Sequence, residues 1–374
     1  MLCKGTRNNE KYKSKNNFPT RERVKTMKAA VLEELEKIVV KEVEDPEIGD
    51  NSALLKVEAV SICGSDIRIF HHGNPRLKTP AIIGHETAGT IVKVGKNVTR
   101  IKEGDRVAVG ADVPCGQCDW CRNGLGNNCA INYAIGYQIP GSFAEYMELT
   151  PLVLDEGPVS TFSEKLSFDD AALAEPLACV LNGLELVNMS LGKSIAIIGL
   201  GPIGCLMIDA ARAMGATKII AAEMVDMRME IAKKYGADVY INSAKEDLVA
   251  RCREETGGHG PDIVMTTCPS VQVHEMAIEM VNHRGYVNLF GGLGKDVRPM
   301  SVLSNTIHYK ECFITGSHGS VPRQHTLAVK MLEAGMVRTQ PIITHHFPLE
   351  KINEAFDTMQ SQKGMKIVIH PHGD

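Results

Sequence analysis

The sequence of 374 residues lacks the features that mark membrane-spanning or nucleic-acid-binding proteins. It has no apolar run near the ~20 residues that a membrane-spanning helix needs. It has no excess of positive charge, because the formal net charge is −4, so a nucleic-acid or anionic-membrane partner finds no support. It shows no internal repeats and no signal peptide, and its 11 cysteines are an odd number, which argues against a disulfide framework. The cysteine usage instead fits the reducing cytoplasm.

What is present is the composition of a soluble globular protein, with 44% hydrophobic and 23% charged residues and a length that predicts two domains. The first 26 residues differ from the rest, because eight Lys or Arg stand there against two Glu, a local charge of +6. Their few apolar residues form no amphipathic face of the kind that a transit peptide has. We therefore expect residues 1–26 to be a disordered basic extension, with the folded chain beginning near Met27.

Hydrophobic patterning divides the remainder into a strand-rich part and an alternating part. Up to about residue 110, short runs rich in Val and Ile lie between turn residues, which predicts a partly open β-barrel. From about residue 193 the pattern alternates, with strands expected at 194–198, 218–223, 239–242, 261–267 and 286–290, and helices at 202–213, 226–235, 244–255 and 271–283. For the second of these helices we predict Asp226 as N-cap and Gly236 as the stop. The alternation is typical of a parallel sheet with helices on both faces, so the fold class is α/β. The last stretch, about 314–370, we assign back to the first part.

Four cysteines lie within fifteen residues, in the spacing C-x2-C-x2-C-x7-C: Cys115, Cys118, Cys121 and Cys129. Four thiolates so close together can surround one tetrahedral ion, and a zinc site with all four positions filled is structural. The main rival is an iron–sulfur cluster, whose bacterial ferredoxin pattern continues x3-C-P after the same opening. Here the last gap is seven residues and Ala130 follows, so the spacing favours zinc.

A glycine motif of the form G-x-G-x-x-G joins the first predicted strand of the alternating part to its first helix, through Gly199, Gly201, Pro202, Ile203 and Gly204. This context is typical of dinucleotide binding, because glycines allow the tight turn and let a pyrophosphate approach the helix N-terminus. The next strand ends in Glu223, whose carboxylate would bind ribose hydroxyls and repel a 2′-phosphate. No basic residue follows directly, although Arg228 lies near. The motif therefore predicts NAD rather than NADP.

Three further segments carry metal-binding side chains: Cys63-Gly64-Ser65-Asp66, Gly84-His85-Glu86 and Ala174-Glu175-Pro176. Together with the cysteine cluster and the glycine motif, and in this order, they make the chain resemble the zinc-dependent medium-chain dehydrogenases of the alcohol dehydrogenase family. Within that family it resembles the sorbitol and related polyol dehydrogenases most. The resemblance covers the chain from about Met27 to its C-terminus. It implies a GroES-like β-barrel catalytic domain at 27–180 and 316–374 and a Rossmann doubly wound parallel-sheet domain at 181–315.

The resemblance also implies a second, catalytic zinc. Cys63 and His85 would be ligands, and Glu86 and Glu175 complete the set, with the choice between the two glutamates left open. Ser65 corresponds to the first hydroxyl of the family's proton relay. Beside the nicotinamide the resemblance places Phe290, Cys179, Ser317 and His318.

Two positions depart from the family pattern. The family often has a relay histidine five residues after the cysteine, where this chain has Arg68, which cannot shuttle protons near neutral pH. His71, His72 or water could carry the proton in place of the relay histidine. Arg68 itself either contacts a cofactor phosphate or an anionic substrate, or is a solvated surface residue. An Arg-Tyr pair that often contacts the polyol is replaced by Gly319 and Ser320, which argues against sorbitol itself.

We therefore expect an NAD-dependent enzyme with two zinc ions per subunit that oxidises a secondary alcohol, with a polyol or sugar alcohol first. The alternatives are L-threonine, a butanediol or a phosphorylated polyol as substrate. A catalytically inactive NAD-binding homologue is disfavoured, because the predicted ligands and all three glycines are present. The cysteine segment, by resemblance, supports contacts in a homo-oligomer, with a tetramer ahead of a dimer.

Overall fold

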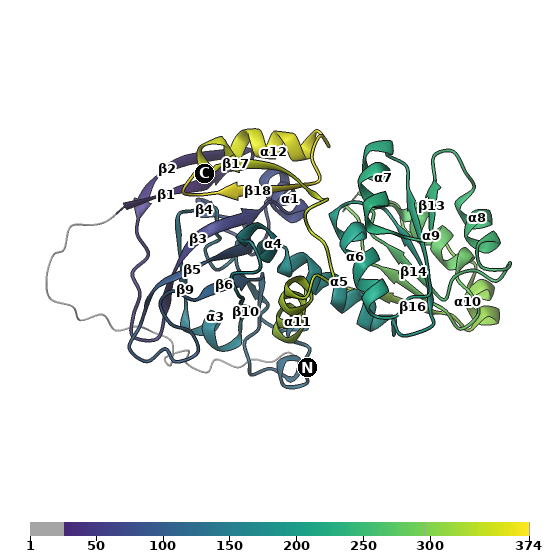
Figure 1. Cartoon of the computed structure of the whole chain (residues 1–374), viewed down its shortest axis with the longest axis horizontal. Helices are drawn as coiled ribbons and strands as arrows, with labels where there is room; N and C mark the ends of the chain where they lie inside the picture. Colours follow the sequence, from purple (N-terminus) through teal and green to yellow (C-terminus); the bar gives the residue numbers. More distant parts are fainter. Residues whose placement is uncertain (1–25, 295, 374) are drawn as a thin grey trace, which may run out of the picture.

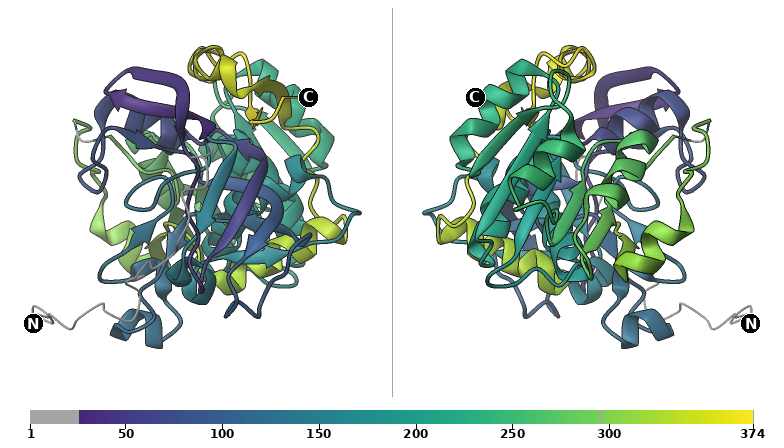
Figure 2. Two further views of the ribbon diagram at one scale, coloured as in Figure 1. Left: turned by 90° about the vertical axis from the view of Figure 1, so that its left-hand side faces the viewer. Right: turned by 90° about the vertical axis from the view of Figure 1, so that its right-hand side faces the viewer.

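The computed structural model describes residues 26–294 and 296–373, so the predicted extension lies outside it except for Thr26. The described chain forms two halves that stand side by side, one built of largely antiparallel strands and one around a parallel sheet (Figure 1). Figure 2 views the molecule from its two ends, with the first half toward the viewer on the left and the second on the right. No helix within the described ranges is long and apolar enough to cross a membrane.

The first half is an open barrel of three sheets. Its seven-stranded sheet runs in the order β10 (Val159–Thr161), β6 (Arg106–Val109), β5 (Glu86–Val94), β3 (Ala53–Ser61), β18 (Lys366–His370) and β17 (Ile343–Pro348), with β9 (Tyr146–Leu149) also pairing with β3. A second sheet joins β2 (Lys37–Glu44), β1 (Thr26–Glu34) and β4 (Ala81–Ile82), and a third pairs β7 (Asp112–Val113) with β8 (Tyr133–Ala134). The C-terminal strands thus enter the sheet of the first half, because β18 pairs antiparallel with β3.

The second half is one six-stranded parallel sheet. Its order is β13 (Val239–Asn242), β12 (Lys218–Glu223), β11 (Ser194–Ile198), β14 (Ile263–Thr266), β15 (Tyr286–Leu289) and β16 (Phe313–Gly316). The order reverses direction at β11, between β12 and β14, and an open α/β sheet binds its ligand at such a switch point. The glycine motif follows β11, so the fold places it at this position.

Twelve α-helices and three 3-10 turns of the described chain complete the two halves. They are α1 (Gly64–His72), α2 (Asp119–Arg122), η2 (Gly126–Asn128), α3 (Pro151–Glu156), α4 (Phe168–Ala172), α5 (Ala174–Leu186), α6 (Pro202–Ala213), α7 (Asp226–Ala232), η3 (Lys233–Tyr235), α8 (Leu248–Glu254), α9 (Val271–Met280), α10 (Ser304–Lys310), α11 (Pro322–Glu333), η4 (Leu349–Lys351) and α12 (Ile352–Gln360). Helix α5 lies between the halves and is buried over most of its length, packing on α6 on one side and α11 on the other (Figure 1). One core cluster therefore runs through both halves, whereas Phe143 and Phe356 belong to a separate barrel core.

Several predicted boundaries are confirmed and some are wrong. The helix at 202–213 and the strands at 194–198, 218–223 and 239–242 have the predicted bounds. Gly236 ends the next helix in the left-handed region, as predicted, but its N-cap is Val225 rather than Asp226, whose carboxylate accepts a hydrogen bond from Asn242. The helix predicted from residue 244 begins only at Leu248, because the side chain of Asp247 caps it by accepting a hydrogen bond from the amide of Ala250.

Candidate active site

Three of the predicted metal ligands meet in the first half. Cys63 is the N-cap of α1, and His85 and Glu86 lie where β5 begins. One ligand atom of each, the Sγ, a ring nitrogen and a carboxylate oxygen, lies within 4.8 Å of the other two. His85 and Glu86 are buried and Cys63 is half-buried, so the group faces inward from two neighbouring elements.

Asp66, for which no role was predicted, contacts the backbone of Cys63 and the ring of His85. Its Oδ2 accepts a hydrogen bond from the backbone amide of Cys63 at 2.9 Å. Its Oδ1 lies 3.2 Å from Nδ1 of His85, close but not aligned as a hydrogen bond. Burial opposes the charged imidazole, yet Asp66 and Cys63 raise the pKa of His85 well above its usual value. A carboxylate behind Nδ1 leaves Nε2 for a metal, which is how metal-binding histidines are generally oriented.

Glu86 is held by Lys366, which no local sequence signal identified. The Lys366 ammonium is buried, forms an ion pair with Oε2 of Glu86, and donates to the carbonyl of Ile62 at 3.1 Å. The hydroxyl of Ser61 donates to the same Oε2. Oε1 of Glu86 is buried and has no hydrogen-bond partner among the described residues. Since a buried acceptor without a partner is costly, this oxygen is the one that suits a metal ion.

Glu175 lies beside the group but outside its 4.8 Å limit. It opens α5, is buried, and accepts a contact from the thiol of Cys179 at 3.6 Å. Burial, with the charges of Glu86 and Asp112, raises its pKa to about 7, although His85 and Lys366 act in the opposite direction. Its assignment as a zinc ligand therefore stays a prediction.

The relay candidates are divided between the site and the surface. Ser65 Oγ lies 3.3 Å from Nε2 of His85, at the predicted metal position. Arg68 is exposed. The ring nitrogens of His71 contact Glu36 and Gln360, neither of which belongs to the site. Of these candidates, Ser65 alone contacts a predicted ligand.

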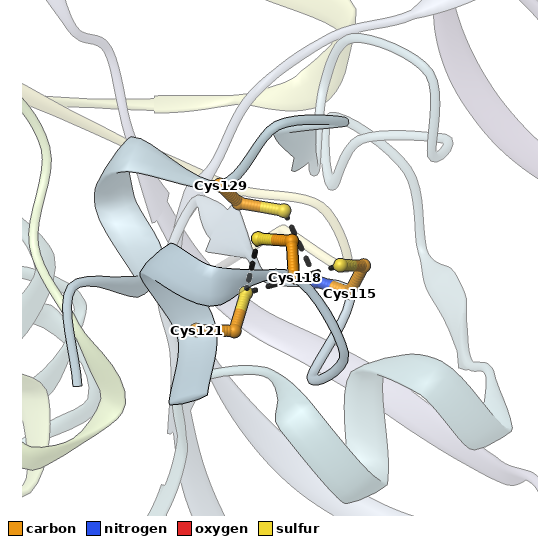
Figure 3. Close-up of side chains that lie close together, drawn as sticks. All are labelled: Cys115, Cys118, Cys121 and Cys129. Atoms are coloured by element: carbon orange, nitrogen blue, oxygen red, sulfur yellow. Dashed lines mark hydrogen bonds between the residues drawn. The ribbon is translucent and has the colours of Figure 1, made fainter. Parts of the chain in front are cut away.

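The four cysteines converge as predicted (Figure 3). The sulfurs of Cys118 and Cys121 are 3.4 Å apart, those of Cys115 and Cys121 are 3.9 Å apart, and the amide of Cys115 donates to Cys129 Sγ at 3.3 Å. Although burial opposes the thiolate, backbone amides of Ala130 and Cys121 contribute to lowering the pKa of Cys118 to about 6. Burial and the neighbouring sulfurs of Cys118 and Cys129 raise the pKa of Cys121 to about 12, so the four thiols do not all ionise without a cation between them. Zinc is the cation that four converging thiolates hold, and the cluster fits a structural ion.

The glycine motif forms a tight turn with room in front of it. Gly199 has φ +100°, and a Cβ on Gly204 would come within 2.1 Å of the carbonyl oxygen of Gly199. A Cβ on Gly201 would meet no atom of the described chain within 4 Å. Pro202 and Ile203 begin α6, whose N-terminal amides point at this space. The turn therefore fits a nucleotide pyrophosphate.

Glu223 ends β12 next to this turn and is buried. Its carboxylate accepts hydrogen bonds from the amides of Leu200 at 2.8 Å, Met224 at 2.8 Å and Val225 at 3.0 Å. Arg228 lies half-buried on α7. An acidic group is thus fixed at the end of the second strand of the sheet.

The predicted nicotinamide-side residues occupy different surroundings. Phe290 packs against Gly183 of α5, and Ser317 donates to Oδ1 of Asn288 at 2.9 Å. The carbonyl of His318 accepts hydrogen bonds from Asn127 and Asn182. The loop that carries His318 is thereby fastened to the cysteine lobe, residues 115–129, and to α5.

Comparison with known proteins gives matches along most of the chain. A family model described as "Alcohol dehydrogenase GroES-like domain" matches residues 49–153, and one described as "Zinc-binding dehydrogenase" matches residues 202–334.

Individual relatives match over nearly their whole length. An L-threonine 3-dehydrogenase of Caldanaerobacter subterraneus is 33% identical over 89% of this chain and 95% of its own, and a sorbitol dehydrogenase of Bombyx mori is 32% identical over 91% and 98%. Among solved structures, a Sinorhizobium meliloti protein described as a zinc-binding dehydrogenase, bound to NADP, superposes with a TM-score of 0.87 at 28% identity, covering 93% of this chain and 100% of that one.

Proposed function

Because the chain belongs to the zinc-dependent alcohol dehydrogenase family and is an oxidoreductase of that class, we propose that it transfers a hydride between NAD and a secondary alcohol, with a polyol or sugar alcohol as the leading substrate class. The observation that carries this proposal is the buried group of Cys63, His85 and Glu86. Its donor set of thiolate, imidazole and carboxylate is one that zinc accepts. The same fold supplies a dinucleotide turn at the switch point of the parallel sheet.

We propose that Sγ of Cys63, Nε2 of His85 and Oε1 of Glu86 hold the ion. Asp66 keeps the imidazole oriented, and Lys366 with Ser61 holds the other oxygen of Glu86, which leaves Oε1 to the metal. Glu175, at the buried start of α5, is the alternative carboxylate.

A zinc ion there would act as a Lewis acid that acidifies a bound alcohol. Ser65, 3.3 Å from His85 Nε2, is placed to accept the alcohol proton while its own hydroxyl proton passes to water. Tyr137 lies beside this route, with its ring 6.2 Å from that of His85. Its ring therefore screens His85 on one side, and a dry site favours hydride transfer.

On the cofactor side, Gly199 to Gly204 would hold the pyrophosphate at the N-terminus of α6. Glu223 supports NAD over NADP, because a buried carboxylate at the end of β12 repels a 2′-phosphate. Phe290, Ser317 and His318 remain candidates for the nicotinamide side, and Arg228 for the adenosine side.

L-threonine is the second candidate substrate. Relatives of that name match 89% of the chain. The carboxylates of Glu86 and Asp112 lie near that of Glu175, and such acidic groups suit a substrate ammonium, which a polyol lacks.

We also propose a homo-oligomer, with a tetramer ahead of a dimer. The cysteine lobe and its flank expose apolar side chains, with Trp120 51%, Leu125 44% and Ile131 49% accessible. Such exposed apolar groups mark a contact surface.

The test is NADH formation across a panel of free polyols, phosphorylated polyols, butanediols and threonine, each with and without a zinc chelator. Chelator-sensitive turnover of a free polyol with NAD, and much weaker turnover with NADP, is the expected result. Turnover with threonine alone would replace the leading substrate by the second candidate. Turnover that the chelator leaves unchanged would contradict the metal assignment.

A further inference from the structure

A third group of metal-binding side chains lies apart from both sites described above. Nε2 of His346 is 2.9 Å from Oδ2 of Asp169, and Nε2 of His370 is 2.8 Å from Oδ1 of the same carboxylate. One ligand atom of each residue lies within 4.8 Å of the other two. We propose that Asp169, His346 and His370 form a binding site for a divalent transition-metal ion such as Zn2+.

The strand register explains why the two histidines meet. In the parallel pair β17–β18, His346 is opposite Val368 and Pro348 is opposite His370. Residues two apart on a strand share a face, so His346, Val368 and His370 project from the same side of the pair. The site is therefore built on two hydrogen-bonded strands whose relative position is fixed by their ladder.

Helix α4 supplies the carboxylate to that face. Val368 belongs to the same buried cluster as Ala171 and Ala172 of α4, whereas Ile367 and Ile369 point into the barrel core. Asp169, in the first turn of α4, thus reaches the two imidazoles from the opposing layer. A helix from the middle of the chain thus meets two C-terminal strands, with Asp169 separated from the two histidines by 177 and 201 positions.

The donor set determines the class of ion. Two imidazoles and one carboxylate suit Zn, Cu, Fe or Ni rather than Mg or Ca. Three protein ligands leave one tetrahedral position for water. Ligand atoms at about 2.0–2.2 Å from a tetrahedral zinc lie about 3.3–3.6 Å apart. The two imidazoles contact different oxygens of Asp169, at 2.9 and 2.8 Å, so the contact to the oxygen that binds the ion needs to widen by roughly half an ångström. His346 has 44% of its side chain exposed, so an ion enters directly from solvent.

The rival interpretation is that Asp169 only accepts a hydrogen bond from each imidazole. Under that interpretation added metal finds no additional site, and substituting any of the three residues changes stability without changing metal content. With a metal bound, in contrast, the ion links α4 to the two C-terminal strands. Metal content and metal-dependent stability therefore separate the two interpretations.

The experiment compares the full-length holoprotein with His346→Gln, with Asp169→Asn and with the matched control His345→Gln. His345 is the neighbouring residue on the same strand, and its Nδ1 contacts Thr344 rather than the cluster. Each protein is equilibrated with Zn2+ alone and desalted, and its bound zinc is counted by mass spectrometry. Zn2+ affinity is then measured by calorimetry, and Tm is recorded with and without excess Zn2+.

Wild type and His345→Gln should bind one more equivalent of zinc than His346→Gln and Asp169→Asn do. Excess Zn2+ should raise the Tm of wild type and His345→Gln and leave that of the other two variants unchanged. The affinity for that equivalent should fall at least about 10- to 100-fold in the variants, the loss that removing an outer-shell partner already causes. Zinc at the cysteine cluster and at Cys63 is common to all four proteins and cancels in the comparison. Equal zinc content and equal affinity in all four would overturn the proposal, and Asp169→Asn decides the matter if His346→Gln fails to fold.

Discussion

Replacing Lys366 with methionine tests whether the buried ammonium neutralises Glu86. Lys366 is 3% exposed and Glu86 1% exposed, and the lysine bridges the carboxylate to the carbonyl of Ile62. Removing one partner of a buried ion pair leaves an uncompensated charge and costs about 3–5 kcal/mol. At about 1.3 °C per kcal/mol, which follows from an unfolding entropy of roughly 2.1 cal/mol/K per residue over 374 residues, Tm should fall by roughly 4–6 °C.

The assay is a thermal scan at one scan rate of protein from which a chelator has removed the metal. A bound metal ion would otherwise supply the positive charge that the lysine provides to Glu86. Ser61→Ala is the milder control, because it removes one hydrogen bond to the same carboxylate and should cost about 1.5–3 kcal/mol. The double variant Lys366→Met/Glu86→Gln should recover part of the loss, since no buried charge remains. A Lys366→Met protein that melts with the wild type would refute this reasoning, because Glu86 would then be neutral without its partner.

Four further outcomes follow from the site and the core. Gly201→Ala should raise the Kd for NAD about tenfold, which is 1.4 kcal/mol, and leave Tm unchanged. Gly204→Ala should lower Tm, because its Cβ would meet a backbone oxygen. If both variants changed Kd and Tm equally, the open space in front of Gly201 would be contradicted. Cys115→Ser should lower Tm and zinc content and perturb assembly more than it changes KM, and an intact oligomer of native stability would count against a structural ion. Glu175→Ala should reduce kcat roughly 100-fold with little change in NAD affinity, and normal turnover would remove it from the site. Burial lowers the pKa of His325 from 6.5 to about 4, so the unfolded state takes up a proton at a higher pH than the folded state does. The contribution of His325 to stability is therefore complete above pH 6.5 and falls by about 3 kcal/mol as the pH drops to 4. His325→Gln should remove this fall when the free energy of unfolding is measured by denaturation across that range.

How far the sequence predicts this molecule depends on how far apart the interacting residues lie. The cysteine cluster and the glycine turn are local, so spacing alone was sufficient to predict them. Lys366 meets Glu86 across 280 positions, through the pairing of β18 with β3, and nothing near Lys366 signals that partner. Asp66 is different, because it lies only three residues after Cys63. At the third position of the helix that Cys63 caps, its side chain could have been predicted to bond to the backbone of Cys63.

Helix ends were missed for a similar physical reason. Asp226 was predicted to cap the helix at 226–235, and Asp247 lay inside the helix predicted at 244–255. The side chain of Asp226 bonds to Asn242 on a neighbouring strand instead, so tertiary contacts removed it from the capping role. Asp247 does cap a helix, but that helix begins at Leu248, four residues after the start that the apolar pattern predicted.

Helix α5 restricts how this protein could be recombined with its relatives. One buried thirteen-residue rod carries Glu175 near its start, Asn182 against the loop of His318, and Glu185 in a bidentate pair with Arg323. If two related sequences were joined inside this helix, the metal site would come from one protein and the nucleotide-binding half that packs on the helix from the other. The two halves are therefore not interchangeable modules, and a functional chimera must inherit α5 together with every surface that packs on it.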